Sequence, residues 1–198
     1  MNRPDRPPGF EYMDFDDFEE ALLDKPEHEK WELIGGRVIR GMVGARWEHH
    51  FITRNLAFAL ESRLRSQNSP CRVFSESFWL KERFIDLAVF PDVMVQCSGP
   101  LEKGATFLRD PFLLAEVVSP GSDNRDRAEK WDLYRRLPSL QHYLMIDRDR
   151  AVIDVMDRAG ERDWQGMRRI EGLEAAVDLA GLGLTLPMRA IYRDVIGG

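Results

Sequence analysis

The sequence predicts an α/β fold in which a mixed β-sheet is flanked by helices. Apolar residues fall four apart over 47–66, and three segments rich in β-branched, aromatic and other apolar residues follow. A charged segment with helical spacing then precedes two more strand-like segments. Such an order of helical and strand patterns is typical of a layered sheet-and-helix domain. A chain of 198 residues is long enough for one domain of this kind and short for two.

The first part of the chain predicts a lead-in, a helix and a hairpin. Residues 1–12 are rich in proline and polar residues, and we expect a flexible lead-in to a single domain over 13–198. A short amphipathic helix is expected before Pro26, because apolar residues recur there at helical spacing: Phe15, Phe18, Leu22 and Leu23. The segment WELIGGRVIRGM then predicts an N-terminal β-hairpin, since Gly35-Gly36 tolerates the positive φ angles of a tight turn.

The middle of the chain predicts one long helix and three strands. The helix is expected from about Trp47 to Ser66, with an apolar stripe made by Ile52, Leu56, Leu60 and Leu64. The strands are expected in CRVFSESFWL, FIDLAVFPDVMVQ and FLLAEVVS.

The last part predicts a helix and several strands. Ser122 or Asp123 can cap a helix that ends near Leu137, because Pro138 cannot continue it. Two more strands are expected in HYLMID and AVIDVMD, around a polar turn at 148–150. The remainder, up to LPMRAIYRDVI, predicts a final hairpin or strand and a short closing helix.

Composition and charge limit the classes of function. No apolar run approaches the roughly 18 residues of a membrane helix, and the opening MNRPDRPPGFEY has no apolar signal-peptide core, so we expect a cytoplasmic protein. The net charge of −6 argues against a general polyanion-binding domain, which is normally basic. A nuclease is not excluded, because clustered acids that hold divalent cations are compatible with local basic strips.

Cys71 and Cys97 are the two cysteines of the chain, and both lie in apolar context. They form no CxxC motif, and no histidine lies at metal-ligand spacing from them. We therefore expect reduced thiols in or near the core, without a redox or metal role.

Two acidic residues stand in strands that otherwise look buried. Glu116 lies in LLAEVVS, and burial of its charge is costly unless a partner stabilises it. Asp92 follows a proline in AVFPDVMVQ. Strand alternation places Asp92 on the face of Met94, and Glu116 on the face of Leu114 and Val118. If the two strands are neighbours, both carboxylates project toward one point and offer hard oxygen ligands suited to Mg²⁺ or Mn²⁺.

A lysine follows on the next predicted helix. Asp126, Lys130 and Tyr134 are spaced four apart, so they share one stripe of that helix. An ammonium turned toward metal-bound carboxylates could orient an attacking water or stabilise the charge that develops on a phosphorus centre. Each feature has a simpler interpretation: the acids as edge or ion-pair residues, Lys130 as a solvated residue or an i,i+4 partner of Asp126, and Tyr134 as core packing.

Together these motifs resemble the Uma-two family of small bacterial proteins grouped with restriction endonucleases, within the PD-(D/E)XK nuclease superfamily. WELIGGRV resembles the opening hairpin of that family, and HHFITRNLAFAL resembles its histidine-led helix. Pro91-Asp92, Ala115-Glu116-Val117 with Ser119-Pro120, Asp126 with Lys130 and Tyr134, and HYLMID complete the order. The resemblance covers roughly residues 13–192.

The resemblance implies a restriction-endonuclease-like fold with a metal site made by Asp92 and Glu116. Superfamily members commonly place a lysine two residues after the Glu, but that position here is Val118. The family implies that Lys130 replaces it from the next helix. Glu32 matches the hairpin acid of the family, as a ligand, a water contact or simply a hairpin residue. His49 fits its helix-start histidine better than His50 does, as a functional residue or a capping or packing residue.

These expectations lead to a function and to two alternatives. The leading hypothesis is a Mg²⁺- or Mn²⁺-dependent phosphodiester hydrolase, an endonuclease that acts on DNA with Asp92, Glu116 and Lys130 as catalytic residues and works as a homodimer. The competing hypothesis is a catalytically silent module with the same fold that binds nucleic acid or assembles with proteins. A nucleoside or sugar-phosphate enzyme ranks lowest, because the sequence has no GxxxxGK[ST] phosphate loop.

Overall fold

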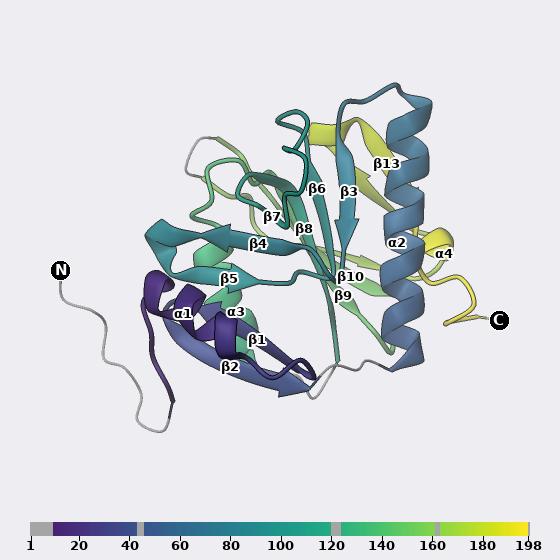
Figure 1. Cartoon of the computed structure of the whole chain (residues 1–198). Helices are drawn as coiled ribbons and strands as arrows, with labels where there is room; N and C mark the ends of the chain where they lie inside the picture. Colours follow the sequence, from purple (N-terminus) through teal and green to yellow (C-terminus); the bar gives the residue numbers. More distant parts are fainter. Residues whose placement is uncertain (1–9, 43–45, 120–123, 161–162, 198) are drawn as a thin grey trace.

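Two mixed β-sheets and a separate hairpin form the framework of the protein, seen here in a computed structural model that describes residues 10–42, 46–119, 124–160 and 163–197 (Figure 1). The larger sheet has six strands in the order β11-β10-β9-β8-β6-β3, and only β8 and β9 run parallel. Its strands are β3 (Arg72–Ser75), β6 (Val93–Gln96), β8 (Pro111–Val118), β9 (His142–Asp147), β10 (Val152–Asp157) and β11 (Arg168–Glu171).

The smaller sheet has five strands in the order β2-β1-β5-β4-β7. They are β1 (Glu29–Ile34), β2 (Arg37–Met42), β4 (Trp79–Glu82), β5 (Leu87–Val89) and β7 (Phe107–Leu108), and a separate hairpin joins β12 (Ala176–Leu179) to β13 (Leu184–Pro187). The helices are α1 (Phe15–Ala21), α2 (Trp47–Ser66), α3 (Asn124–Tyr134) and α4 (Met188–Ile191), with 3₁₀ turns η1 (Leu22–Asp24), η2 (Arg83–Ile85) and η3 (Ala180–Leu182). The predicted α/β fold with flanking helices is confirmed. In the described part of the chain, no helix is long and apolar enough to span a bilayer.

Helix α2 has the predicted bounds and packs with α4 on the side of the molecule opposite α1, α3 and the β1–β2 hairpin (Figure 1). Its predicted stripe of Ile52, Leu56, Leu60 and Leu64 is fully buried. These side chains join a core cluster with Leu113, Ala115 and Val117 of β8 and with residues of β13 and α4. The apolar side of α2 therefore covers one face of the larger sheet.

Strand β8 lies between β6 and β9 at the centre of the larger sheet, and a core cluster covers each of its faces. Leu114 belongs to a second cluster, formed with Met94 of β6 and with Leu133 and Tyr134 of α3. The alternation predicted for β6 and β8 is thus confirmed: Met94 and Leu114 face α3, whereas their neighbours face α2. Asp92 and Glu116 have the parity of the α3 face.

The β1–β2 hairpin forms as predicted around Gly35 and Gly36, whose φ angles of 59° and 84° fit a two-residue turn. On β1, Trp31 and Leu33 pack with Phe15 and Phe18 of α1 in a third cluster. In contrast, Leu23, counted among the apolar residues of the first helix, is exposed, because α1 ends at Ala21 and a 3₁₀ turn follows.

The N-terminal edge of the described chain also pairs with this hairpin. The amide of Val38 donates to the carbonyl of Glu11 at 2.9 Å, and Tyr12 forms a bridge with Arg37. Residues 1–9 of the predicted lead-in lie outside the described residues.

Two of the three strands predicted in the middle of the chain are wrong as single strands. CRVFSESFWL contains β3 and β4, which belong to different sheets, and Glu76 between them has a φ of 50°. FIDLAVFPDVMVQ likewise divides into β5 and β6 at Pro91, which lacks the amide hydrogen that a continuous ladder requires. The breaks direct the chain from one sheet to the other.

Helix α3 ends at Tyr134, three residues before the predicted end at Leu137. The amides of Arg136 and Leu137 donate to the carbonyls three residues earlier, each at 3.0 Å, so the chain leaves the helix through tighter turns. The predicted caps, Ser122 and Asp123, lie outside the described residues. The later strands β9 and β10 and the closing β12–β13 hairpin with α4 match the predictions.

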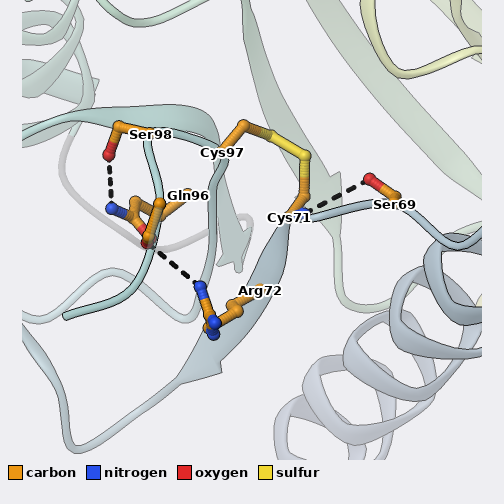
Figure 2. The surroundings of a disulfide bond; sticks show 7 residues. Ser69, Cys71, Arg72, Gln96, Cys97 and Ser98 are labelled. Atoms are coloured by element: carbon orange, nitrogen blue, oxygen red, sulfur yellow. Dashed lines mark hydrogen bonds between the residues drawn. A yellow bond between two sulfur atoms is a disulfide. The ribbon is translucent and has the colours of Figure 1, made fainter.

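The prediction of reduced cysteines is wrong: Cys71 and Cys97 form a disulfide (Figure 2). Arg72 of β3 pairs with Gln96 of β6, so the antiparallel register places the two cysteines opposite each other, with Cα atoms 4.1 Å apart. The sequence separation of 26 gave no sign of this, because the proximity depends on β3 and β6 being neighbours. The bond closes the end of the strand pair that follows α2.

We expect reduction of this disulfide to lower the free energy of unfolding by about 3 kcal/mol, because the bond restricts the unfolded chain over a loop of this length. Urea denaturation with and without dithiothreitol measures the change. The double variant Cys71→Ser/Cys97→Ser should match the reduced protein and be insensitive to the reductant. Two titratable thiols in the untreated native protein would contradict the pairing.

Candidate functional site

A cavity of about 210 Å³ lies where the two sheets and the ends of α2 and α3 meet. Both sheets contribute to its wall, together with one side chain from the first turn of α2 and two from α3. The lining residues are Lys30, Glu32, His49, Phe90, Asp92, Glu116, Val117, Val118, Arg127, Lys130 and Tyr143. Most of them are polar or charged, which is unusual for an enclosed position between two cores.

Asp92 and Glu116 meet because β6 and β8 are neighbours. Val93 pairs with Ala115 in the antiparallel register, so Asp92, one residue earlier, lies across from Glu116. Asp92 Oδ2 accepts a hydrogen bond from the amide of Val117 at 2.7 Å, which fixes the carboxylate at the start of β6. The predicted convergence of the two acids in one place is therefore observed.

Lys130 and Tyr134 reach Glu116 from α3. Lys130 Nζ lies 3.2 Å from Glu116 Oε1, and the hydroxyl of Tyr134 donates to the same oxygen at 2.9 Å. The Lys130 side chain is only 12% exposed, so it is not the solvated helix residue of the simpler interpretation. Oε2 of Glu116 accepts no hydrogen bond from any residue in the described part of the chain.

Glu32 completes the acidic side of the cavity from β1. Its Oε1 accepts a hydrogen bond from the amide of Phe90 at 2.8 Å, which ties β1 to the segment just before Asp92. Its Oε2 lies 3.9 Å from Lys130 Nζ, so the lysine lies between two carboxylates. Glu32 thus has a direct place in the site, beyond a role in hairpin pairing.

His49 joins the cluster from the first turn of α2. Its Nε2 lies 3.1 Å from Asp92 Oδ2, whereas His50 is exposed and pairs with Glu76 at 3.6 Å. His49, the residue that fits the helix-start histidine of the family, thus lines the cavity, whereas His50 does not. Nδ1 of His49 is buried and has no hydrogen-bond partner among the described residues.

The electrostatics of the cavity follow from burial and from the crowding of acids. Burial raises the pKa of Glu116 to about 7, against the opposing effect of Lys130, and Asp92 and Glu32 raise it further. Burial also raises the pKa of Tyr134, and Glu116 adds to this, so the hydroxyl remains a donor. For His49 burial acts in the other direction, but its hydrogen bond and charge interaction with Asp92 raise its pKa overall.

The structure brings together Asp92, Glu116, Lys130, Tyr134, Glu32 and His49, all of them candidates from the sequence. The side chain of Asp126, a further candidate, lies outside the described residues. Sequence reasoning missed Lys30, Phe90, Arg127 and Tyr143 in the cavity wall. Lys30 had a usable signal, because it precedes Glu32 by two residues on the same strand.

The donor set fits a divalent cation that keeps part of its water shell. Asp92 Oδ1 and Glu116 Oε2 are carboxylate oxygens without a described hydrogen-bond donor, and they come from facing strand positions. In the described part of the chain, no three His, Cys, Asp or Glu side chains already surround a common point. Mg²⁺ is commonly held by one or two carboxylates with waters, so two such oxygens in a cavity of this size suffice.

We expect Glu116→Gln to stabilise the metal-free protein increasingly as pH rises from about 4.5 to about 7. In this window the unfolded chain has lost the Glu116 proton while the folded wild type still holds it, so wild-type stability falls with rising pH. The gain of the variant over wild type should grow by up to ~3 kcal/mol across the window. Urea titrations in chelator at several pH values measure it.

The exposed Glu102→Gln is the matched control, since it removes the same group outside the cavity. Asp92 raises the pKa of His49, and this adds stability that is lost as pH rises. Because His49 is present in both proteins, the difference between variant and wild type largely removes its contribution. A gain that does not change with pH would show that Glu116 ionises normally in the fold.

Comparison with known proteins finds relatives by sequence and by structure. Two proteins of Synechocystis sp. match: uncharacterized protein sll1609 is 30% identical over 69% of this chain and 76% of its own length, and uncharacterized protein slr1290 is 28% identical over 85% and 86%. A crystal structure from Anabaena variabilis, described as a "putative nuclease belonging to DUF820", superposes with a TM-score of 0.69 at 20% identity, over 91% of this chain and 97% of that one. The fold is therefore shared with that structure.

A family model matches residues 15–189, a range that includes every element of the site. The match agrees with the resemblance carried by the hairpin, the histidine-led helix and the acids of β6 and β8. The chain belongs to the Uma2 family, whose description is "Putative restriction endonuclease".

Proposed function

We propose that the protein is a metal-dependent phosphodiester hydrolase, an endonuclease that acts on DNA. The observation that carries the proposal is a buried carboxylate, Glu116, opposite Asp92 in a cavity that also contains Lys130. A sheet interior normally excludes such a group, and its retention calls for a ligand or a reaction. The family description and the shared fold support the same class of reaction.

Asp92 and Glu116 would hold Mg²⁺ or Mn²⁺ through the oxygens that face the cavity. A bound ion of this kind lowers the pKa of a coordinated water and polarises a phosphoryl oxygen. The amide of Val117 and the ring of His49 both contact Asp92 Oδ2, so they fix the direction of its free oxygen. Contacts of this kind orient a carboxylate for metal binding.

Lys130 would act on the reacting phosphate. In the free protein its Nζ lies 3.2 Å from Glu116 and 3.9 Å from Glu32, at the wall of the cavity. A cation in this position stabilises the negative charge that grows on the phosphorus centre, or orients the attacking water. The hydroxyl of Tyr134, one turn after Lys130 on α3, donates to the same Oε1 of Glu116 and holds it in place.

One observation favours the second candidate, a catalytically silent module with the same fold. Glu116 already has an ion-pair partner and a hydrogen-bond donor on its Oε1, so its charge is partly stabilised without a metal. Such a module would bind nucleic acid or a protein partner without cleaving it. Metal titration and cleavage assays separate the two candidates.

We further infer a homodimer as the working form and the cytoplasm as its location. Two copies related by a two-fold axis would present one cavity to each strand of a duplex. Analytical ultracentrifugation with and without duplex DNA tests this, and a monomer in both conditions would contradict it.

Glu116→Gln should abolish cleavage of plasmid and single-stranded DNA in Mg²⁺ or Mn²⁺, with a loss of about 10²-fold or more, because it removes a charged ligand. Calorimetric titration should show weaker cation binding by the same variant. Glu102→Gln should behave as wild type in both assays. Wild-type cleavage by Glu116→Gln would reject the site, and cation binding without cleavage of DNA or RNA would favour the silent module.

Lys130→Ala should lower turnover by about 10²-fold or more while cation binding is retained, since the ammonium acts on the phosphate rather than on the ion. Its loss also leaves Glu116 without its counter-charge, so a melting curve must accompany the assay. Lys130→Arg keeps the charge and tests whether the shape of the ammonium matters. Unchanged turnover in Lys130→Ala would remove the lysine from the mechanism.

A further inference from the structure

Lys30 is a cation in the cavity wall that the proposed mechanism does not use. It lies on β1, two residues before Glu32, so strand alternation directs both side chains to the face that lines the cavity. Trp31 between them points the other way, into the cluster with Phe15 and Phe18. The same strand therefore places the Lys30 ammonium and the Glu32 carboxylate at the cavity wall.

Among the described residues, Lys30 has an aromatic ring rather than a carboxylate beside its ammonium. Its Nζ lies 5.0 Å from the centroid of the Phe90 ring, and it forms no ion pair with a carboxylate in the described part of the chain. This differs from Lys130, which lies between two acids. The Phe90 ring is itself packed against Trp79, with centroids 3.7 Å apart, so the aromatic surface under the ammonium is fixed.

An ammonium held this way suits an anion. The face of an aromatic ring attracts a cation without using all of its N–H donors, so donors remain available to a ligand. Within a partly enclosed cavity, the attraction between this charge and an anion is stronger than at the open surface. The acids Glu32, Asp92 and Glu116 make the other side of the same cavity unfavourable for an anion until a cation is bound.

We propose that Lys30 is a phosphate-binding residue that holds a non-bridging oxygen of the DNA backbone at the cavity. The inference rests on the proposed nuclease function and adds a substrate contact to it. Lys30 binds the backbone as a charge, independent of the base sequence, and so compensates locally for the negative net charge of the chain. It acts on binding, whereas Lys130 acts on the reaction.

The test measures the affinity of the full-length protein for a fluorescent DNA duplex by anisotropy, in Ca²⁺, from about 50 to about 300 mM salt. Loss of one phosphate contact reduces the slope of log affinity against log salt by about 0.9. Lys30→Gln should show this reduction and bind about tenfold more weakly at the lowest salt, whereas Lys30→Arg should keep most of the slope.

Lys103→Gln is the matched control, because Lys103 is an exposed lysine outside the cavity wall and its substitution changes the net charge equally. Melting curves of all variants should agree closely with wild type, since Lys30 gives up no ion pair with a described residue. In steady-state cleavage, Lys30→Gln should raise KM with little change in kcat, as expected for a contact made equally in the ground and transition states.

The outcomes separate this proposal from the nuclease proposal. Equal slopes for Lys30→Gln and Lys103→Gln, with wild-type cleavage intact, overturn the phosphate contact and leave the nuclease standing. A reduced slope in a protein that cleaves neither DNA nor RNA keeps the contact and favours the silent module. Absence of any DNA binding by wild type overturns the contact, because Lys30 would then have no backbone to hold.

Discussion

The pairing of β6 with β8 is the interaction on which the rest of the site depends. It places Asp92 across from Glu116 and lets the amide of Val117 hold the Asp92 carboxylate. Glu116 is then enclosed between β6, β9 and α3, where its charge needs stabilisation that water cannot provide. Lys130 and Tyr134 supply part of it. Glu116 Oε2 accepts no hydrogen bond from a described residue, and Glu116 lines the cavity. The residue whose burial is costly is therefore also the residue that can bind a ligand there.

Local patterns were sufficient for elements that a single periodicity defines. The four-residue spacing from Ile52 to Leu64 identified helix α2, and Gly35-Gly36 identified the hairpin, because both signals depend only on neighbouring residues. The divisions at Glu76 and Pro91 were missed because an apolar run looks alike whether it continues in one sheet or crosses to another. The disulfide was missed for a related reason: the contact between Cys71 and Cys97 exists only once β3 and β6 pair.

For the candidate site too, local spacing predicted some residues and long-range contacts were needed for others. Strand parity predicted that Asp92 and Glu116 share a face, and the helical repeat predicted that Lys130 and Tyr134 lie together. The resemblance to a family supplied Glu32 and His49, since neither position is linked to the acids by spacing. Phe90 was missed, because only the meeting of the two sheets brings β1 beside the segment before Asp92. Lys30 could have been inferred from Glu32, which lies two residues further along the same strand.

The two faces of strand β8 have different roles. The side chains toward α2 are purely apolar and belong to the cluster that stabilises the larger sheet, while the opposite face carries Glu116 next to Leu114. Substitutions of Leu113 and Ala115 under α2 can therefore change thermal stability without altering the cavity, whereas Val117 belongs to the same cluster and also lines the cavity wall. Substitutions of the polar cavity residues can change its chemistry while that core stays intact. In a scaffold divided in this way, the residues of the cavity can change while the fold is retained.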